Sequence, residues 1–184
     1  EKAAIGTLRS LAAAQQQLQA SAAIDTDADG GGEHGYLAEL AGTNGIRAYV
    51  GEGVAPTVSA IRLDPAYLPA SFGELTPAAS GAALIRGGYA YQVYLPAGDA
   101  ERPVRGIPED LNGGASLDMP GSSNAELLWC AYAWPLDRHD APWATLFINQ
   151  SGDVIKTSGT AIQRYTGLNG GPSFDAVFAN PGDM

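Results

Sequence analysis

Three aspartates at alternate positions, Asp25, Asp27 and Asp29, are the residues whose type and spacing most clearly predict chemistry. They stand in residues 24–35, which read IDTDADGGGEHG. Alternate side chains of a tightly curled backbone point toward one centre, and a hard cation prefers carboxylate oxygens. The pattern matches the opening of a calcium-binding loop, with ligands at positions one, three and five and Gly30 at position six, where the chain turns sharply. We therefore predict a calcium site here.

The rest of the loop follows this pattern only in part. Gly31 at position seven would offer its backbone carbonyl, and Glu33 at position nine would reach the ion directly or through a water. Position twelve is Tyr36 in place of the usual bidentate glutamate, so we expect neither a paired EF-hand nor a calcium sensor. Glu39, one helical turn later, is an open candidate to replace this last ligand and is not counted among the predicted ligands. The predicted cofactor is calcium, and its predicted ligands are Asp25, Asp27, Asp29, Gly31 and Glu33.

The same residues also fit a turn without a metal. Aspartate side chains accept hydrogen bonds from nearby backbone N–H groups, and so they favour turns and helix ends. In this alternative the aspartates cap the end of the first helix and the start of the next segment. The sequence leaves both interpretations open.

Histidine, the usual acid–base residue of enzymes, occurs only at His34 and His139. His139 lies between Asp137 and Asp140, which could orient an imidazole, but no Gly-x-Ser-x-Gly elbow supplies a nucleophile. We favour a solvated loop histidine over a hydrolase that uses His139. No phosphate-binding loop, dinucleotide fingerprint, Cys-x-x-Cys or His-Glu-x-x-His motif occurs. We therefore expect a protein that is not an enzyme and has no catalytic residues.

Aromatic residues are the remaining candidates for binding. Trp129, Trp134 and Trp143, with eight tyrosines, could form a sugar-stacking platform, although aromatic residues in strands are more often core. The single Cys130 stands in an apolar strand, where it behaves as a small buried hydrophobe. With 20 acidic against 10 basic residues the formal charge is -10, which repels phosphate backbones and anionic lipid headgroups alike. Nucleic acid is thus excluded as an expected partner.

The elements that would hold the acidic loop are a helix before it and strands after it. Residues 2–23 are rich in Ala, Gln and Leu, and their apolar side chains recur at spacings of three and four, which predicts an amphipathic helix. Strands are predicted at residues 89–95, 127–134, 144–148 and 154–156. The stretch 127–134, LLWCAYAW, is apolar on both faces, so the helix should pack against it.

One domain covering residues 1–184 is expected, because 184 residues with 45% hydrophobic side chains suffice for one core. Its parts are an amphipathic helix over 1–23, an acidic loop over 24–36 and a main sheet region over 89–165. Residues 46–86 contain four prolines and residues 96–124 resemble a long irregular excursion, so no element is assigned there. The predicted fold class is α+β, with a long N-terminal α-helix packed on an antiparallel β-sheet.

This order of parts resembles the globular domains of type IV pilins and type II secretion pseudopilins. More narrowly, four stretches look like recurrent segments of bacterial pilin-like proteins with prepilin N-terminal methylation segments. These stretches are residues 4–11 with the Ala/Gln run after them, 33–40, 129–135 and 147–153. The resemblance covers about half of the chain, and it implies a pilin-like fold. The calcium prediction rests on the loop pattern alone.

The resemblance further implies a structural subunit of a type IV pilus-like or type II secretion pseudopilus-like filament. Such a subunit is processed by a prepilin peptidase and held in the inner membrane, with a periplasmic head or a final place in an extracellular filament. Its partners would be other pilin or pseudopilin subunits and the inner-membrane assembly machinery. We expect the first helix to be the lower half of a longer helix whose hydrophobic part precedes Glu1. The rival interpretation is an exported carbohydrate- or ligand-binding module.

Overall fold

The computed structural model describes residues 1–52, 55–98, 105–114, 119–137, 144–157 and 165–177. Its helical elements are α1 (Lys2–Ser21), α2 (Leu37–Leu40), the 3-10 helix η1 (Ala70–Gly73) and α3 (Ser122–Leu127). Its first strands are β1 (Arg47–Ala48), β2 (Thr57–Val58), β3 (Leu75–Ala78), β4 (Gly81–Arg86) and β5 (Tyr89–Pro96). The later strands are β6 (Gly106–Pro108), β7 (Cys130–Pro135), β8 (Leu146–Asn149) and β9 (Ile155–Lys156).

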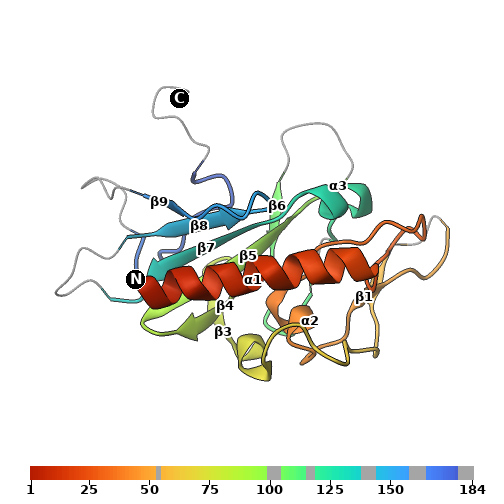
Figure 1. Cartoon of the computed structure of the whole chain (residues 1–184), viewed down its shortest axis with the longest axis horizontal. Coiled ribbons are helices and arrows are strands. Elements are labelled where there is room, and N and C mark those ends of the chain that lie inside the picture. Colours follow the sequence, from red (N-terminus) through yellow and green to blue (C-terminus); the bar gives the residue numbers. More distant parts are fainter. Residues whose placement is uncertain (53–54, 99–104, 115–118, 138–143, 158–164, 178–184) are drawn as a thin grey trace.

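A seven-stranded antiparallel sheet forms the centre of the molecule (Figure 1). Its order is β3-β4-β5-β7-β8-β9, and β6 pairs with the end of β5 beyond the part that β4 covers. The long register between β5 and β7 runs from Tyr89 opposite Pro135 to Tyr94 opposite Cys130. A second, two-stranded sheet pairs β1 with β2. Every residue of β5 is buried, as expected for a central strand that is covered on both faces.

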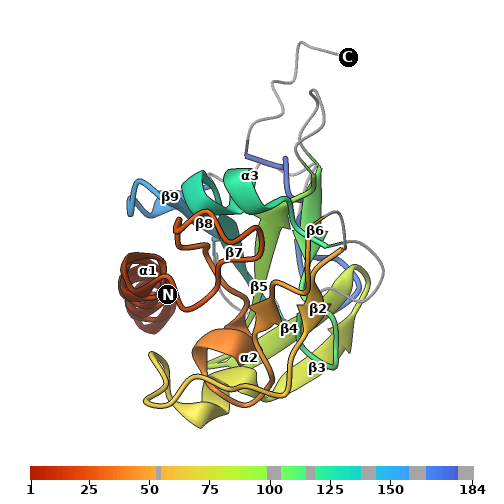
Figure 2. The same cartoon turned by 90° about the vertical axis from the view of Figure 1, so that its right-hand side faces the viewer.

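Helix α1 covers one face of this sheet and contacts β7 and β8 (Figure 2). Leucines at positions 8, 11 and 18 are buried against the core, because spacings of three and four place them on one side of the helix. Helix α1 ends where Ala22 adopts a left-handed conformation with φ 48°. Among the described residues, none of the helices combines the length and the apolar character that crossing a membrane requires.

The other face of the sheet is covered by the chain near the C-terminus. Tyr94, Tyr132 and Trp134 form a second core cluster with side chains from residues 165–177. Tyr132 donates a hydrogen bond of 2.8 Å to the carbonyl of Phe174, and Trp134 donates one of 2.8 Å to the carbonyl of Gly167. The sheet therefore lies between α1 and this C-terminal segment.

This architecture corrects the predicted fold class. We expected a pilin-like α+β fold, with a long N-terminal helix packed on an antiparallel sheet whose main region was residues 89–165. The described chain is mostly antiparallel sheet, and α1, with its 20 residues, is the only described helix longer than six. The sheet already begins at Leu75, in the stretch where prolines seemed to exclude strands. Pro77 is tolerated because β3 is an edge strand, where a missing N–H leaves no partner unpaired.

Candidate metal centre

The acidic loop follows directly from the end of α1 and is closed at its base. The backbone N–H of Glu33 donates to the carbonyl of Ile24 at 2.9 Å, and the N–H of His34 donates to the carbonyl of Ala125 at 2.9 Å. Gly32 passes so close to α1 that a Cβ at this position would lie 1.8 Å from the carbonyl oxygen of Gln19. The loop is thus fastened to α1 on one side and to α3 on the other.

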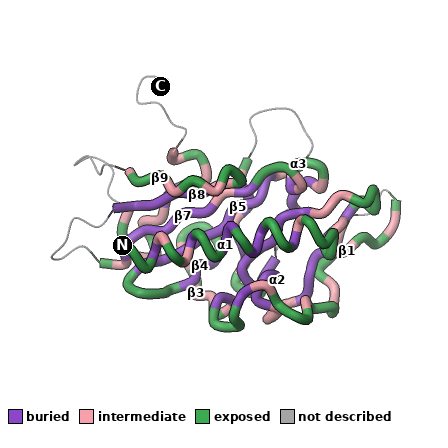
Figure 3. Tube along the Cα trace, viewed as in Figure 1, coloured by how far each residue is buried: buried purple, intermediate pink, exposed green. Residues whose placement is uncertain are grey.

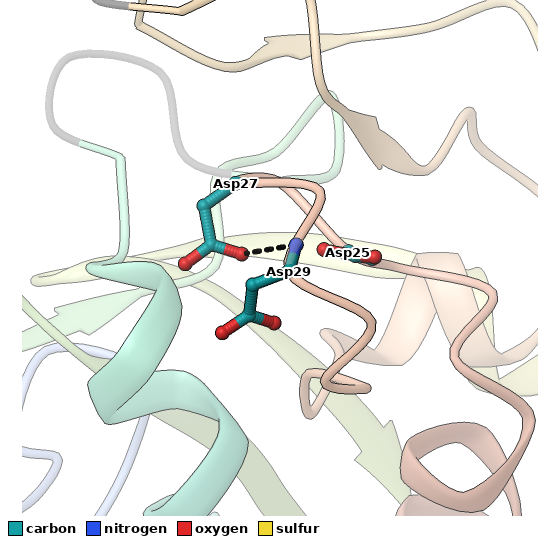
Figure 4. A group of neighbouring side chains, drawn as sticks. All are labelled: Asp25, Asp27 and Asp29. Carbon is teal, nitrogen blue, oxygen red and sulfur yellow. Dashed lines mark hydrogen bonds between the residues drawn. The ribbon is translucent and has the colours of Figure 1, made fainter.

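Three aspartates come together in this loop, as the alternate spacing predicts (Figure 4). Asp25, Asp27 and Asp29 each offer a carboxylate oxygen, and these oxygens lie within 4.8 Å of one another. A cation placed among them would be bound by hard oxygen ligands, which suits calcium or magnesium. Burial is the largest cause that raises the pKa of Asp27. The charge of Asp29 and contact with Asp25 raise this pKa further.

Hydrogen bonds within the loop hold the carboxylates in place. The N–H of Gly30 donates to Asp25 at 3.1 Å, and the N–H of Gly31 donates to Asp29 at 2.7 Å. The N–H of Asp29 donates more weakly to Asp27 at 3.4 Å (Figure 4). Side-chain bonds of this kind are also those of the acidic turn, so the alternative without a metal remains compatible with the geometry. The other Asp25 oxygen is buried and has no hydrogen-bond partner among the described residues.

Glu126, on α3, places a further carboxylate beside the loop, which no sequence pattern predicts. A Cβ built on Gly31 would lie 2.5 Å from the carboxyl carbon of Glu126, so this side chain rests directly on the loop. Burial, followed by the charges of Asp29 and Asp27, raises the pKa of Glu126. Its Oε1 atom is buried without a hydrogen-bond partner in the described part of the chain. Because Glu126 is far from the loop in sequence, no local pattern could have identified it.

The other predicted ligands are placed differently from the three aspartates. Glu33 is fully buried, and its carboxylate accepts hydrogen bonds from the Thr26 N–H at 2.7 Å and from the Ser122 hydroxyl at 2.7 Å. Its second oxygen is 2.7 Å from Arg47. The Glu33 carboxylate is therefore engaged in protein contacts, and its role as a ligand at position nine stays a prediction. The role of the Gly31 carbonyl as the ligand at position seven also stays a prediction.

Glu39, the proposed substitute for position twelve, also turns inward. It accepts a hydrogen bond from the N–H of Tyr36 at 2.8 Å and lies 3.1 Å from the Nε of Arg47. Tyr36 is buried and donates its hydroxyl to the carbonyl of Ile107 at 3.0 Å. Glu33 at position nine and Glu39, the candidate replacement for position twelve, thus both contact Arg47 in the interior.

A buried ionic cluster consequently lies beneath the acidic loop. Arg47 is 1% exposed and pairs with both Glu33 and Glu39, and it stacks over the Tyr36 ring at 5.6 Å. Burial lowers the pKa of Arg47, but the charges of the two glutamates outweigh it, so the net pKa is raised. Arg47 was not identified from the sequence, because its contacts with Glu33 and Glu39 depend on how β1 packs against the loop and α2.

A third buried glutamate, Glu109, belongs to the same region. Its two oxygens accept hydrogen bonds from the N–H groups of Leu37 at 2.9 Å and Ala38 at 2.7 Å, at the start of α2. Burial raises the pKa of Glu109 to about 8, and the charge of Glu39 adds to this, whereas the two backbone hydrogen bonds oppose it. Glu109 thus satisfies N–H groups that the first turn of a helix leaves without partners.

Of the remaining candidates for chemistry that the structure describes, His34, Trp129 and Trp134 are buried and Cys130 is half-buried. His34 is 3% exposed, and burial lowers its pKa to about 4. Trp129 and Trp134 are 4% and 0% exposed, and burial raises the pKa of the Cys130 thiol to about 12. His139, Asp140 and Trp143 lie outside the described residues.

Comparisons of the chain with protein-family models, with curated proteins and with solved structures find no match. The geometry of the described residues supports one kind of site, a cluster of three aspartates that could hold a metal ion.

Proposed function

We propose that this protein is a non-catalytic structural subunit of a filament of the type IV pilus or type II secretion pseudopilus class. The observation that carries the proposal is the outer face of α1. This helix runs along the sheet as the outermost element on its side, and its outer residues are exposed along its whole length (Figures 2 and 3). A face of this kind is what a subunit needs to contact a neighbour in a heterologous, open-ended assembly.

Small side chains dominate this face and make close packing possible. Exposed residues at intervals of three and four are Ala3, Gly6, Ser10, Ala13, Gln17 and Ala20, and all but Gln17 are small. The distance between two packed helices depends on the side chains at the contact, and small ones allow the nearest approach. The charged residues of the helix, Lys2 and Arg9, leave the centre of this stripe uncharged. Other subunits are therefore the partners that we propose.

A structural role also agrees with how the described ionisable groups are used. Arg47 pairs with both Glu33 and Glu39 in the interior, and His34 is held neutral at physiological pH. The buried contacts of Glu33, Glu39 and Arg47 join the acidic loop, α2 and β1, which is a structural use of charge. The proposed location is outside the cytoplasm, with the subunit either anchored in the inner membrane or incorporated in an extracellular filament.

The experiment produces the full-length gene product together with a pilus or pseudopilus assembly system and images filaments by electron microscopy. Ala13→Glu places a charge in the middle of the exposed α1 face and should abolish filaments. Ala60→Glu, at an exposed alanine outside α1, is the matched control and should leave them intact. Both purified variants should melt at the wild-type temperature. A wild-type protein that forms no filaments, or unchanged filaments of Ala13→Glu, would contradict the proposal.

Within this function we propose that calcium binds to Asp25, Asp27 and Asp29 and stabilises the junction between α1 and the sheet. Support comes from the convergence of the three carboxylates and from the neighbouring Glu126, which would gain a positive partner for its buried oxygen. Calcium lowers the repulsion among these acids, and it takes six to eight oxygen ligands, so water would complete its shell.

Isothermal titration calorimetry at millimolar calcium tests this site. Wild type should bind one ion, and its melting temperature should rise with calcium. Asp29→Asn should weaken binding, whereas Asp153→Asn, at an exposed aspartate between β8 and β9, should not. A wild-type titration without heat and without a change in melting temperature would establish the acidic turn instead.

A further inference from the structure

The chain contains one complete acceptor motif for N-linked glycosylation, Asn149-Gln150-Ser151. This modification requires an asparagine, then any residue except proline, and then serine or threonine. The other five asparagines, at positions 44, 112, 124, 169 and 180, have neither serine nor threonine two residues later. Because a motif of three residues also arises by chance, its place in the fold decides whether it can be used.

The motif lies in the turn that connects β8 with β9. Asn149 is the last residue of β8, and the N–H of Gly152 donates to its carbonyl at 2.9 Å, which closes a four-residue turn. Gln150 and Ser151 are exposed, and Asn149 is half-buried. The strand that follows, β9, has two residues and stands last in the order of the described sheet. The motif is therefore at the surface, where a bulky hydrophilic group is tolerated.

The side chain of Asn149 is held with its oxygen toward Ser151. Its Oδ1 accepts hydrogen bonds from the Ser151 N–H at 3.0 Å and from the Ser151 hydroxyl at 2.7 Å. A backbone N–H can only donate, so the atom that it contacts must be the amide oxygen. The amide nitrogen, Nδ2, makes no hydrogen bond to a described residue and is not buried. The atom that would carry a sugar is thus accessible.

The space beside this asparagine is open. Asn149 and Gln150 border a hollow of about 220 Å³ between α1, the end of α3 and the turn. Gln16 and Gln19 of α1 form part of the opposite wall. This hollow leaves space for a first sugar ring next to Asn149, so the folded protein can accommodate the group that the motif accepts.

We propose that Asn149 is glycosylated on Nδ2. The donor is a sugar that is joined through its anomeric carbon to a polyprenyl diphosphate. The electron pair of Nδ2 forms a bond to the anomeric carbon, while the bond from this carbon to the diphosphate oxygen breaks and the diphosphate leaves with that electron pair. Nδ2 gives up one proton to a base of the transferase, and no group is oxidised or reduced.

The inference goes beyond the proposed filament and needs only its location. This modification belongs to secreted proteins, so it relies on the proposed place outside the cytoplasm and not on assembly. The glycan would stand beside α1, because Gln16 and Gln19 border the same hollow as Asn149. It would keep this side of the helix solvated.

Mass spectrometry of the protein isolated from its natural host tests the proposal. Trypsin releases residues 139–156 as one peptide, because Arg138 precedes this stretch and Lys156 ends it. In wild type the peptide should carry at least one hexose or N-acetylhexosamine. Fragmentation of the peptide should locate the sugar on Asn149.

Variants produced in the same host identify the acceptor. Asn149→Gln and Ser151→Ala should each lose the glycan completely, whereas Ser151→Thr keeps the hydroxyl and should keep the glycan. Asn169→Gln, at an exposed asparagine in another turn, is the matched control and should be glycosylated as wild type is. Thermal unfolding shows that each variant is folded, and Ser151→Ala changes only an exposed hydroxyl.

Three results overturn the proposal. The first is a wild-type peptide without a sugar, and the second is a Ser151→Ala variant that keeps its glycan. The third is a glycan that persists in Asn149→Gln, which would place the sugar on a serine or threonine hydroxyl. Because the glycan is measured by mass and not by assembly, a glycosylated protein that forms no filaments would contradict the filament proposal alone.

Discussion

Arg47 and Glu33 form an ion pair of 2.7 Å in which neither side chain is more than 1% exposed. Glu33 belongs to the acidic loop and Arg47 to β1, and Glu39 of α2 lies 3.1 Å from the same guanidinium. One arginine thereby joins three segments beneath the candidate metal centre. Because charges are costly to bury alone, each of these groups depends on the others.

Removal of the Arg47 side chain should strongly destabilise the protein. Arg47→Met leaves Glu33 and Glu39 as buried carboxylates without their cation, and breaking such a pair costs about 3–5 kcal/mol. Urea denaturation measures the free energy of unfolding. Arg62→Met, at an exposed arginine, is the control and should change stability by less than about 0.5 kcal/mol.

Partial rescue distinguishes lost charge balance from lost packing. The triple variant Arg47→Met, Glu33→Gln and Glu39→Gln removes both unpaired charges, so it should be more stable than Arg47→Met alone. Were the triple variant less stable than the single one, the cost would lie in packing and hydrogen bonds and the charge argument would be wrong.

The protein should become less stable as the pH rises, because Glu109 loses its proton. Its pKa of about 8 in the folded protein lies above the ordinary value of 4.5, so the folded state binds the extra proton between these limits. Stability due to this proton is present below pH 4.5, is lost as the pH rises and is gone above about 8. The free energy of unfolding at pH 6.5 and 8 measures it.

Glu109→Gln should flatten this part of the pH profile, since glutamine does not titrate. Glu74→Gln, at an exposed glutamate, should keep the wild-type slope. A Glu109→Gln profile parallel to that of wild type between pH 6.5 and 8 would show that Glu109 is already ionised in the folded state at pH 6.5.

His34 has the opposite effect and acts at lower pH. Its pKa of about 4 in the folded protein lies below the ordinary 6.5, so the unfolded chain binds a proton that the folded protein rejects. The stability from the neutral imidazole is complete above pH 6.5 and is lost as the pH falls toward 4. His34→Gln should therefore lose less stability than wild type between pH 6.5 and 4.5, by thermal unfolding in buffers of equal ionic strength. Equal losses in both proteins would refute this assignment.

Two glycines near α1 should respond to alanine in opposite ways. Gly32→Ala would place a Cβ 1.8 Å from the carbonyl oxygen of Gln19, so the loop must move and stability should fall by more than about 2 kcal/mol. Gly6→Ala meets no atom within 4 Å inside a helix and should stabilise by about 0.5–1 kcal/mol. Chemical denaturation of both variants checks the signs. A Gly32→Ala variant as stable as wild type would mean that the loop is not held against α1.

Local patterns were enough to predict several parts of this protein. The helix predicted at residues 2–23 is found at 2–21, and the strands predicted at 89–95, 127–134 and 144–148 correspond to β5, β7 and β8, except that Leu127 ends α3 and β7 begins only at Cys130. The convergence of Asp25, Asp27 and Asp29 follows from their alternate spacing in a curled loop. In each case the residues that make up the pattern are neighbours along the chain, so their order alone indicates the element, although the strands find their partners far away in sequence.

Other features were decided only by contacts between distant segments. The fold class was wrong because strands β3 and β4 arise in a stretch whose Pro77 is acceptable only at a sheet edge, and an edge is a property of the whole sheet. Glu126 reaches the acidic loop because α3 docks there. Arg47 meets Glu33 and Glu39 because β1 passes below the loop. The sequence by itself thus determined where the aspartates gather. Tertiary packing decided which further charges surround them, because buried charges take partners in space and not along the chain.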